Sequence, residues 1–388
     1  MTQLAHEITE TYRLPEALLE QLLTPALVIF PANVRHNVRA MIDACGSPDR
    51  WRPHLKTTKS PVIWQELLDA GIRQFKCATT REAALMLRLL ADNGIAGADL
   101  LIAYPLIGPA VRRASQLAAQ FETSRLSVLC EDAALAAALP GELGVFVDVN
   151  PHMNRTGVPL EEVERIIEIA AAAGGRFRGV HFYDGHIRDR EPATRRARAE
   201  ALYGQLLELR IAIISAGAAV PEVITSGTMT FEAALEFDPL SGLEGTAHRI
   251  SPGTVVFSDW MTEQARLATG LRPAALLLSR VISRPTGAMA TCDAGSKSIA
   301  AEAGDPCARV LDYPHLTALK PSEEHLPMAV ELDRGASPSL GEALLLVPRH
   351  ICPTVNLAER AVLVEDGEVA GVIEIAGRGH ELIVEDAE

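Results

Sequence analysis

Short apolar runs alternate with amphipathic stretches between about residues 25 and 260 of the chain. The clearest amphipathic stretch is residues 160–173, LEEVERIIEIAAAA, in which Val163, Ile166, Ile167 and Ile169 recur at helical spacing. Such a stripe is typical of a helix that packs one face on a core, whereas short apolar runs are typical of buried strands. The pattern therefore predicts strand and helix in regular alternation.

Eight of the runs are predicted as strands, at residues 26–30, 52–56, 74–77, 100–104, 126–130, 145–149, 179–183 and 223–225. Helices are predicted between them, among others at residues 60–70, 80–91, 109–121 and 160–173. Strands that alternate with helices form a parallel sheet, and eight of them close a TIM (β/α)8 barrel. The alternative is an open doubly wound sheet, but no GxGxxG motif follows the first strand to support a dinucleotide-binding version. We predict the barrel.

The pattern changes after about residue 270, where long helices disappear. Runs separated by Gly, Pro and Asp turns predict strands at residues 274–282, 289–293, 343–347, 360–365 and 371–375. This arrangement indicates a compact C-terminal β domain. A length of 388 residues also favours two domains over one core. We expect an N-terminal segment at 1–24 that packs on the β domain, the barrel at 25–268 and the β domain at 269–388.

Charge and composition narrow the class of protein. The formal net charge is −14, which disfavours nucleic acid and anionic membranes as partners. No stretch approaches the roughly 20 apolar residues of a membrane span, and the N-terminus lacks the order of a signal peptide. The six cysteines are scattered without a CxxC pair, so neither a disulfide framework nor a zinc ribbon is expected. These features predict a soluble cytoplasmic protein.

Residues with candidate catalytic side chains lie at the C-terminal ends of predicted strands, which is where a barrel has its active site. Lys56 ends the second predicted strand, with His54 two residues earlier on the same face. From spacing alone, a surface loop with two lysines is the simpler interpretation. A lysine that lies in a barrel mouth can instead act as a Schiff-base nucleophile.

Later strand ends add further polar groups. Arg155 follows the sixth strand, and Tyr183 and His186 follow the seventh. Each also has an ordinary structural interpretation, as a surface ion-pair partner or a buried histidine with satisfied hydrogen bonds. The last loops contain small hydroxyl and glycine residues that fit the phosphate site of a barrel, namely Ser226, Gly227, Thr228, Gly253 and Thr254.

The sequence His350-Ile351-Cys352 lies between Pro348 and Pro353. If this segment is extended, residues two apart face the same side, so the imidazole and the thiolate could share one metal ion. A nitrogen and sulfur pair suits Zn²⁺. An isolated HxC motif is weak support for a metal site without further context.

At these residues the chain resembles the fold-type III pyridoxal-phosphate family that contains D-threonine aldolase and eukaryotic-type D-serine dehydratase, whose barrel is shared with alanine racemase. The segment Arg52-Pro53-His54-Leu55-Lys56-Thr57 is similar to the family motif RPHxKT, in which the lysine carries the cofactor. Residues 293–297 (DAGSK), Glu324-His325 and residues 350–354 (HICPT) resemble further family signatures. The resemblance extends over nearly the whole chain.

The resemblance implies a role for each candidate residue. Lys56 would hold pyridoxal 5′-phosphate and move the α-proton, with His54 beside it, Arg155 facing the pyridine nitrogen and Tyr183 lining the cofactor. Phosphate would be held by Ser226, Gly227, Thr228, Gly253 and Thr254. His350 and Cys352 would hold a divalent metal next to the substrate's β-hydroxyl, with Zn²⁺ favoured and Mn²⁺ or Mg²⁺ as alternatives. The family is typically a homodimer, in which the β domain of one copy covers the barrel mouth of the other.

Three positions depart from the aldolase members. The metal motif of the aldolases resembles HxD, whereas this chain has Cys352 at the third position. The aldolases also carry a histidine six residues after the barrel tyrosine, which is Tyr183 here, whereas this chain has Asp189 at that place. Some relatives read KTHK at the reactive lysine, where this chain has Thr58. The first two departures favour dehydration.

The leading hypothesis is therefore a lyase that dehydrates a D-3-hydroxy amino acid to a keto acid and ammonia. The alternative is retro-aldol cleavage to glycine and an aldehyde, with His186 as the base on the β-hydroxyl. An amino-acid racemase would not need the metal pair. A non-catalytic pyridoxal-phosphate-binding protein is typically close to a bare barrel and would not need the β domain.

Overall fold

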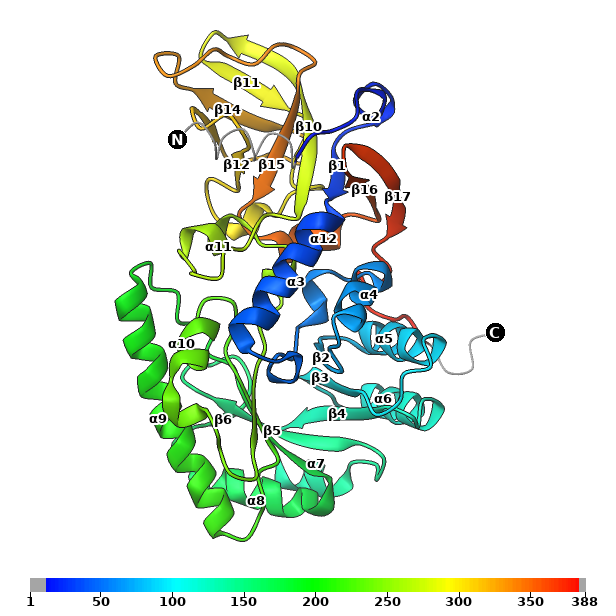
Figure 1. Cartoon of the computed structure of the whole chain (residues 1–388), viewed down its shortest axis with the longest axis vertical. Coiled ribbons are helices and arrows are strands. Elements are labelled where there is room, and N and C mark those ends of the chain that lie inside the picture. The colour runs from blue at the N-terminus through cyan, green and yellow to red at the C-terminus, as the bar shows by residue number, and fades with distance from the viewer. Residues whose placement is uncertain (1–11, 384–388) are drawn as a thin grey trace.

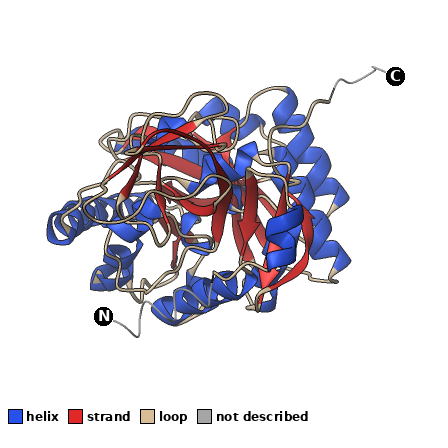
Figure 2. Cartoon of the chain, turned by 90° about the horizontal axis from the view of Figure 1, so that it is seen from above, coloured by secondary structure: helices blue, strands red, loops and turns tan. Residues whose placement is uncertain are grey.

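The computed structural model describes residues 12–383 as a parallel barrel with a β domain above it (Figure 1). Seen from above, helices surround the strands of the barrel (Figure 2). The predicted architecture, a barrel followed by a C-terminal β domain, is confirmed. No helix of the described residues is long and apolar enough to cross a membrane.

The barrel is built from parallel strands joined by helices. Its strands are β2 (Gln74–Cys77), β3 (Asp99–Pro105), β4 (Arg125–Cys130), β5 (Gly144–Asn150), β7 (Phe177–Phe182), β8 (Glu222–Thr225) and β9 (Ala247–Ile250), and the short β6 (Val158–Pro159) pairs with β5. The helices of this part are α3 (Pro31–Cys45), α4 (Pro61–Asp69), α5 (Thr80–Asp92), α6 (Pro109–Gln120), α7 (Ala133–Ala138), α8 (Val163–Ala173), α9 (Pro192–Ser215) and α10 (Phe231–Glu236).

Residues 51–54 close the ring between β9 and β2. Trp51 forms a parallel bridge to Ile250 of β9, and His54 forms a parallel bridge to Lys76 of β2. The backbone N–H of Arg52 donates to the carbonyl of Ile250, and the N–H of Lys76 donates to the carbonyl of Pro53. The segment is followed at once by a single 3-10 turn, Leu55–Thr57, which carries Lys56 out of the ring.

The sequence assigned one strand to the wrong sheet and missed another. The strand expected at residues 52–56 also ends at His54, where the 3-10 turn Leu55–Thr57 begins. Residues 26–30 were expected in the barrel, but β1 (Ala26–Ile29) pairs with strands of the β domain. The ring is completed instead by β9, whose sequence AHRI lacks the apolar run used to find strands. A short apolar run shows that a strand is buried and contains no information on the sheet to which it belongs. The division into segments 1–24, 25–268 and 269–388 stays a proposal, amended in that β1 belongs to the β-domain sheet.

The β domain is a nine-stranded sheet that contains β1 and the C-terminal strands. These are β10 (Ala275–Thr286), β11 (Met289–Cys292), β12 (Ala308–Val310), β13 (Leu316–Ala318), β14 (Leu326–Val330), β15 (Ala343–Pro348), β16 (Arg360–Glu365) and β17 (Glu368–Glu374). Short helices α11 (Trp260–Gln264) and α12 (Ile351–Leu357) lie between the two parts (Figure 1). In the described part of the N-terminal segment, the leucines of α2 (Glu16–Gln21) pack on this sheet.

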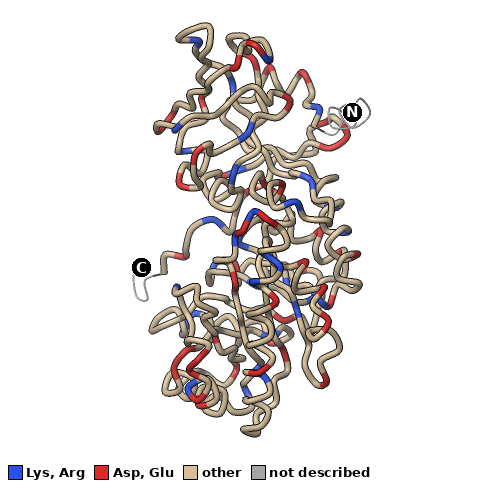
Figure 3. The backbone as a smooth tube through the Cα atoms, turned by 90° about the vertical axis from the view of Figure 1, so that its left-hand side faces the viewer, with Lys and Arg blue, Asp and Glu red and all other residues tan. Residues whose placement is uncertain are grey.

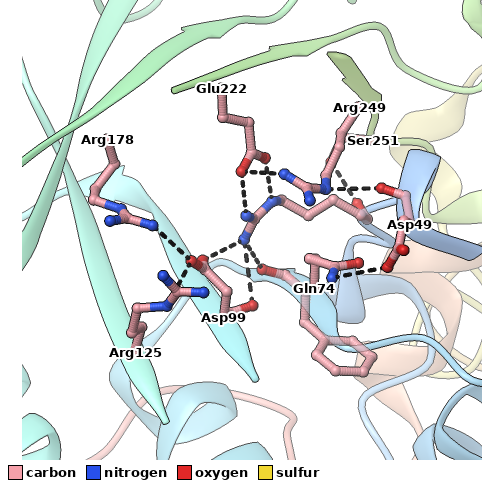
Figure 4. Close-up of polar contacts among 10 residues, drawn as sticks. Asp49, Gln74, Asp99, Arg125, Arg178, Glu222, Arg249 and Ser251 are labelled. Atoms are coloured by element: carbon pink, nitrogen blue, oxygen red, sulfur yellow. Dashed lines mark hydrogen bonds and ion pairs between the residues drawn. The ribbon is translucent and has the colours of Figure 1, made fainter. Parts of the chain in front are cut away.

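Side chains inside the barrel form three layers, because alternate residues of a strand point to the same side. The middle layer is apolar and consists of Leu101, Leu129, Phe146 and Ile224. Below it, at the N-terminal ends of the strands, lies a network of ion pairs around Glu222 and Asp99 (Figure 4). Above it, at the C-terminal ends, lie the polar groups of the candidate site, among them His54, Lys76, Asp148 and His181. The side chains of the barrel thus separate the candidate site from the ion pairs below.

Charged residues of both signs are interspersed over the barrel and the β domain (Figure 3). The excess of acidic residues is therefore spread along the chain. This arrangement agrees with the acidic balance of the sequence, −14 at neutral pH.

Candidate active site

Two adjoining cavities open at the C-terminal ends of the barrel strands. The outer cavity has a volume of about 660 Å³ and reaches up to α12, and the inner cavity of about 420 Å³ extends into the barrel mouth. Lys56, Arg155, Tyr183 and Thr254 line both of them. Of the twelve candidate residues predicted from sequence, ten line at least one cavity; the exceptions are His186 and Ser226.

Lys56 lies where the two cavities meet. Its side-chain amine donates no hydrogen bond to a described residue, so it remains free to react. The imidazole of His54 accepts from the backbone N–H of Lys56 at 3.4 Å, which fixes the turn that carries the lysine. Burial, together with Lys56 and Lys76, holds the pKa of His54 well below its usual range, so this imidazole is neutral and can accept.

A buried acid and histidine pair adjoins the inner cavity, with the histidine in the cavity wall. Nδ1 of His181 on β7 lies 2.7 Å from Oδ1 of Asp148 on β5, and Thr156 donates to Oδ2 of the same carboxylate at 2.8 Å. Burial lowers the pKa of His181, although the hydrogen bond and charge of Asp148 oppose this shift. Both oxygens of the Asp148 carboxylate therefore accept a hydrogen bond. The second ring nitrogen of His181, Nε2, makes no hydrogen bond to a described residue.

Tyr183 is held between a cation and two glycines. The guanidinium carbon of Arg155 lies 5.1 Å from the centre of its ring. A Cβ at Gly185 would lie 2.3 Å from the ring, and one at Gly227 would lie 3.0 Å away, so both positions require glycine for the ring to stay where it is. Burial raises the pKa of Tyr183, which keeps its hydroxyl protonated.

The loops after β8 and β9 offer hydrogen-bond donors that the protein leaves unused. None of the backbone N–H groups of Ser226, Thr228, Gly253 and Thr254 donates to a described residue. The hydroxyl of Ser226 is buried without a partner, and the residue has a φ of 62°, a left-handed conformation uncommon for a non-glycine residue. Grouped donors of this kind form a binding site for an anion such as phosphate.

Asp184 supports the first of these loops from below. Its carboxylate accepts from the Tyr203 hydroxyl at 2.6 Å, from Thr230 Oγ1 at 2.8 Å and from the backbone N–H of Gly227 at 3.2 Å. The N–H of Gly227 already donates to Asp184, so it is not available to a phosphate. The contribution of Gly227 to phosphate binding is therefore the absence of a side chain, which lets the anion approach the backbone.

His350 and Cys352 lie side by side on the outer cavity. The expectation of an extended segment was wrong, because His350 is the N-cap of α12 and Cys352 lies in its first turn. Burial alone would raise the pKa of the Cys352 thiol, but the neighbouring His350 and Lys59 lower it to about 6. Its sulfur lies 3.1 Å from Thr57 Oγ1 and 3.4 Å from Thr254 Oγ1, so the thiolate adjoins the turn of Lys56.

His350 and Cys352 are the only two protein ligands that the described part of the chain offers to a metal ion at this place. No group of three or more His, Cys, Asp or Glu side chains that could hold an ion occurs among residues 12–383. A nitrogen and a thiolate at the edge of a cavity still fit a divalent metal whose other ligands are water and substrate, as in catalytic sites with open positions.

Asp259 and Lys59 fix the metal loop. Asp259 accepts from the backbone N–H of Ile351 at 3.1 Å and from Thr262 at 2.7 and 2.8 Å. The amine of Lys59 donates to the carbonyl of Cys352 at 2.9 Å and also to the carbonyl of Lys56. One buried lysine thus ties the cofactor turn to the metal loop.

His186 is the predicted catalytic residue that the structure does not bring to the cavities. Its ring is half-buried, lines neither cavity and leaves Nδ1 without a partner. Asp189, at the position of the aldolase histidine, pairs with Arg198 at 2.6 Å and is also absent from both linings. Thr58 is buried, and its hydroxyl accepts from Trp64 Nε1 at 2.8 Å, which gives this departure a structural role.

The sequence did not single out Lys59, Lys76, Asp148, His181, Asp184 and Asp259. A signal existed for Lys76, since it lies within a predicted buried strand, between Phe75 and Cys77. A charged residue at such a position faces the barrel interior and is functional or paired. The others depend on contacts between distant strands and have no local signature.

The inner cavity fits pyridoxal phosphate. Its volume lies within the usual range for small-molecule sites. It combines a free amine at Lys56, unused donors near Ser226 and Thr254 for an anion, and an aromatic wall at Tyr183. These groups match an aldehyde, a phosphate and an aromatic ring in one ligand.

Two family models match the chain. Residues 29–232 match the alanine racemase N-terminal domain, and residues 274–364 match a putative serine dehydratase domain. The two matched regions correspond to most of the barrel and to most of the β domain.

Relatives of known activity match over the length of the chain. The chain is 31% identical over 379 residues to a D-threonine aldolase of Arthrobacter sp., covering 92% of this chain and 93% of the relative. It is 25% identical to a D-threo-3-hydroxyaspartate dehydratase of Delftia sp., covering 89% and 95%. Among solved structures it is similar to a D-threonine aldolase from Filomicrobium marinum, with a TM-score of 0.80, 27% identity and coverage of 92% and 95%.

Proposed function

This chain belongs to the fold-type III pyridoxal-phosphate family of D-threonine aldolase and D-serine dehydratase, and we propose that it dehydrates a D-3-hydroxy amino acid to a keto acid and ammonia. That it is a pyridoxal-phosphate-dependent lyase follows from its relatives. The choice of dehydration depends on one observation. In the loop after β7, neither His186 nor Asp189 lines the cavities, so the base that cleavage would require on the β-hydroxyl is missing from that loop.

Bound pyridoxal phosphate supplies the electron sink that weakens the bonds at the substrate's α-carbon. Lys56 is proposed to hold the cofactor and then to take the α-proton, because its amine is free and opens to both cavities. Ser226, Thr228, Gly253 and Thr254 would donate to the phosphate, and Gly227 would allow its close approach. Arg155 would orient the pyridine nitrogen without protonating it, since a guanidinium stays charged.

His350 and Cys352 would hold the divalent metal, which supplies Lewis acidity to an oxygen ligand. Zn²⁺ suits an imidazole and a thiolate best, with Mn²⁺ or Mg²⁺ as alternatives. Lys59 and Asp259 keep both ligands directed toward the cavity through the backbone contacts described above. Departure of the β-oxygen as hydroxide needs no base on that oxygen, whereas cleavage needs one. The loop after β7 supplies none to the cavities, which favours elimination here.

Cleavage to glycine and an aldehyde is the second candidate. The 31% identity to an aldolase, against 25% to a dehydratase, is the observation that favours it. His380 lines the outer cavity and could serve as its base. A homodimer is part of both proposals through the family resemblance, and the mass of the particle in solution tests it.

Product analysis decides between the two reactions. The protein loaded with pyridoxal phosphate is incubated with D-serine, D-threonine and D-3-hydroxyaspartate, with and without a chelator. The proposal predicts chelator-sensitive keto acid and ammonia, lost in Cys352→Ala and kept in Cys307→Ala, which removes a buried cysteine of the β domain. Chelator-sensitive glycine and aldehyde would show that cleavage is the reaction.

A further inference from the structure

Lys76 is a buried amine for which the mouth of the barrel provides no partner. The residue is 2% exposed, its side chain lines the inner cavity, and it donates no hydrogen bond to a described residue. The contact that the structure records for its amine is the ring of Tyr183, at 5.6 Å from the centre. A buried amine without a partner is costly. It is retained most readily where a ligand supplies the partner.

The carboxylate of Asp148 interacts electrostatically with Lys76, but both of its oxygens already accept hydrogen bonds from other residues. Asp148 accepts from His181 at 2.7 Å and from Thr156 at 2.8 Å. The other cations that line the inner cavity differ from Lys76, because Lys56 is half-buried and Arg155 is exposed and stacked on Tyr183. Lys76 is therefore the cation placed deepest in this cavity among the described residues.

The order of strands places Lys76 on a defined side of Lys56. The segment that carries Lys56 pairs on one edge with β9, through Trp51 and Ile250, and on the other edge with β2, through His54 and Lys76. The unused donors for phosphate follow β8 and β9. Around the ring the order is thus phosphate loops, Lys56, then Lys76.

Pyridoxal phosphate has the same order of groups. The ring carbon that bears the aldehyde lies between the carbon that bears the phosphate arm and the carbon that bears the phenolic oxygen. With the aldehyde carbon at Lys56 and the phosphate at the β8 and β9 loops, the phenolic oxygen faces β2. We propose that Lys76 binds the phenolic oxygen of the cofactor, an inference that rests on the proposed function.

Burial, with Lys56 and Arg52 nearby, lowers the pKa of the Lys76 amine. A phenolate at hydrogen-bond distance opposes this shift, because its negative charge favours the protonated amine, and the pair then forms a charge-assisted hydrogen bond from an ammonium to a phenolate. It offsets the burial of the amine and stabilises the ionised oxygen. Lys76 is therefore proposed as a cofactor-binding residue that also sets the absorption of the bound cofactor, because the charge on the phenolic oxygen is part of the chromophore.

A cycle of two proteins and two cofactors tests the proposal. Wild-type protein and Lys76→Met are titrated with pyridoxal phosphate and with 3-deoxypyridoxal phosphate, which lacks the phenolic oxygen. Lys76→Met should bind pyridoxal phosphate roughly 10- to 100-fold more weakly, the range of one charge-assisted hydrogen bond, and should bind the deoxy analogue about as well as wild type does. The absorption of bound pyridoxal phosphate should also change. The control Lys320→Met, an exposed lysine of the β domain, should alter neither.

Equal weakening for both cofactors would overturn the proposal, since it would show a loss unrelated to the phenolic oxygen. Unfolding of the cofactor-free proteins in denaturant excludes a folding defect, because Lys76→Met should be at least as stable as wild type once the unpaired amine is gone. If Lys76→Met does not fold, Lys76→Leu, which also lacks a donor, is used in the same cycle with the same expectations. Failure of wild type to bind pyridoxal phosphate at Lys56 would refute the proposed function itself.

Discussion

Charged side chains are buried at both ends of the barrel interior, at the floor around the N-terminal ends of the strands and at the mouth around their C-terminal ends. The two ends differ in how these side chains are paired. On the floor, Arg52 is fully buried and donates to both oxygens of Glu222 at 2.8 Å and to Asp99 at 2.9 Å. Glu222 and Asp99 are labelled in Figure 4. Arg249 adds a bond to Glu222 at 2.6 Å. Burial would raise the pKa of Asp99, but Arg52 with Arg125 and Arg178 lowers it. Each acid of the floor thus has a partner within the protein.

At the mouth some groups, such as Asp148 and Lys59, are paired, but several donors that lie around the cavities lack partners. The amines of Lys56 and Lys76, the hydroxyl of Ser226 and the backbone N–H groups of two loops donate to no described residue. An unpaired buried polar group lowers stability, so its presence here indicates that a ligand completes it. The comparison separates groups that stabilise the barrel from groups that bind and react.

Loss of Lys56 should have the largest effect at the mouth. Lys56→Met removes the proposed base, and turnover should fall about 10²- to 10⁴-fold, the usual contribution of a positioned acid or base. Its stability should change little, because the amine donates no hydrogen bond in the protein. Steady-state rates and denaturant unfolding measure the two, with Lys320→Met as the control. Full activity in Lys56→Met would contradict the assignment.

Loss of Arg52 on the floor should mainly lower stability, whereas loss of Lys56 should mainly lower turnover. Arg52→Met leaves Glu222 and Asp99 without their shared cation, which should lower the free energy of unfolding by about 3–5 kcal/mol. The exposed Arg284→Met should change it by less than about 0.5 kcal/mol. Denaturant unfolding of cofactor-free protein gives both values. A cost for Arg52→Met as small as that of the control would mean that the network contributes little.

Asp184 lies between these extremes, because it is a paired group that supports a loop of unpaired ones. Asp184→Asn replaces an acceptor with a donor opposite Tyr203, Thr230 and the N–H of Gly227, and should cost about 1–3 kcal/mol. Pyridoxal-phosphate affinity should fall with it, as measured by absorbance titration. Unchanged cofactor affinity would show that the loop does not hold the phosphate.

The smallest effect is expected at His186. Because its ring lines neither cavity, His186→Ala should change the rate of keto-acid formation by no more than about twofold, the effect of a surface substitution. The measurement is the same product assay with D-3-hydroxyaspartate. A loss of about 10²-fold or more in His186→Ala would show that His186 acts as a catalytic base.

The sequence was sufficient to predict most of the architecture. The strands at residues 74–77, 126–130 and 360–365 were found to within one residue, since local apolar patterning determines them. The helix expected at residues 80–91 was also confirmed as α5, whose N-cap Thr79 accepts from the backbone N–H of Glu82 at 3.1 Å. Patterning did not assign β1 to its sheet and missed β9, because neither depends on a local signal.

The candidate site was predicted only as far as motifs extend. Lys56, His350 and Cys352 belong to recognisable motifs, whereas Lys76, Asp148 and His181 come together only when three separate strands close the ring. The sequence also does not predict whether a buried polar group has a hydrogen-bond or ion-pair partner. Arg52 and Lys76 are both buried cations in predicted strands, and only the fold shows that one is paired and the other is not.

The most direct test of the account is to identify which lysine at the mouth carries the cofactor. Holoprotein is reduced with borohydride, digested and analysed by mass spectrometry for the pyridoxyl label, in wild type and in Lys59→Met. The account predicts a single labelled site at Lys56 in both proteins. A label on Lys59 or Lys76, or none at all, would contradict it.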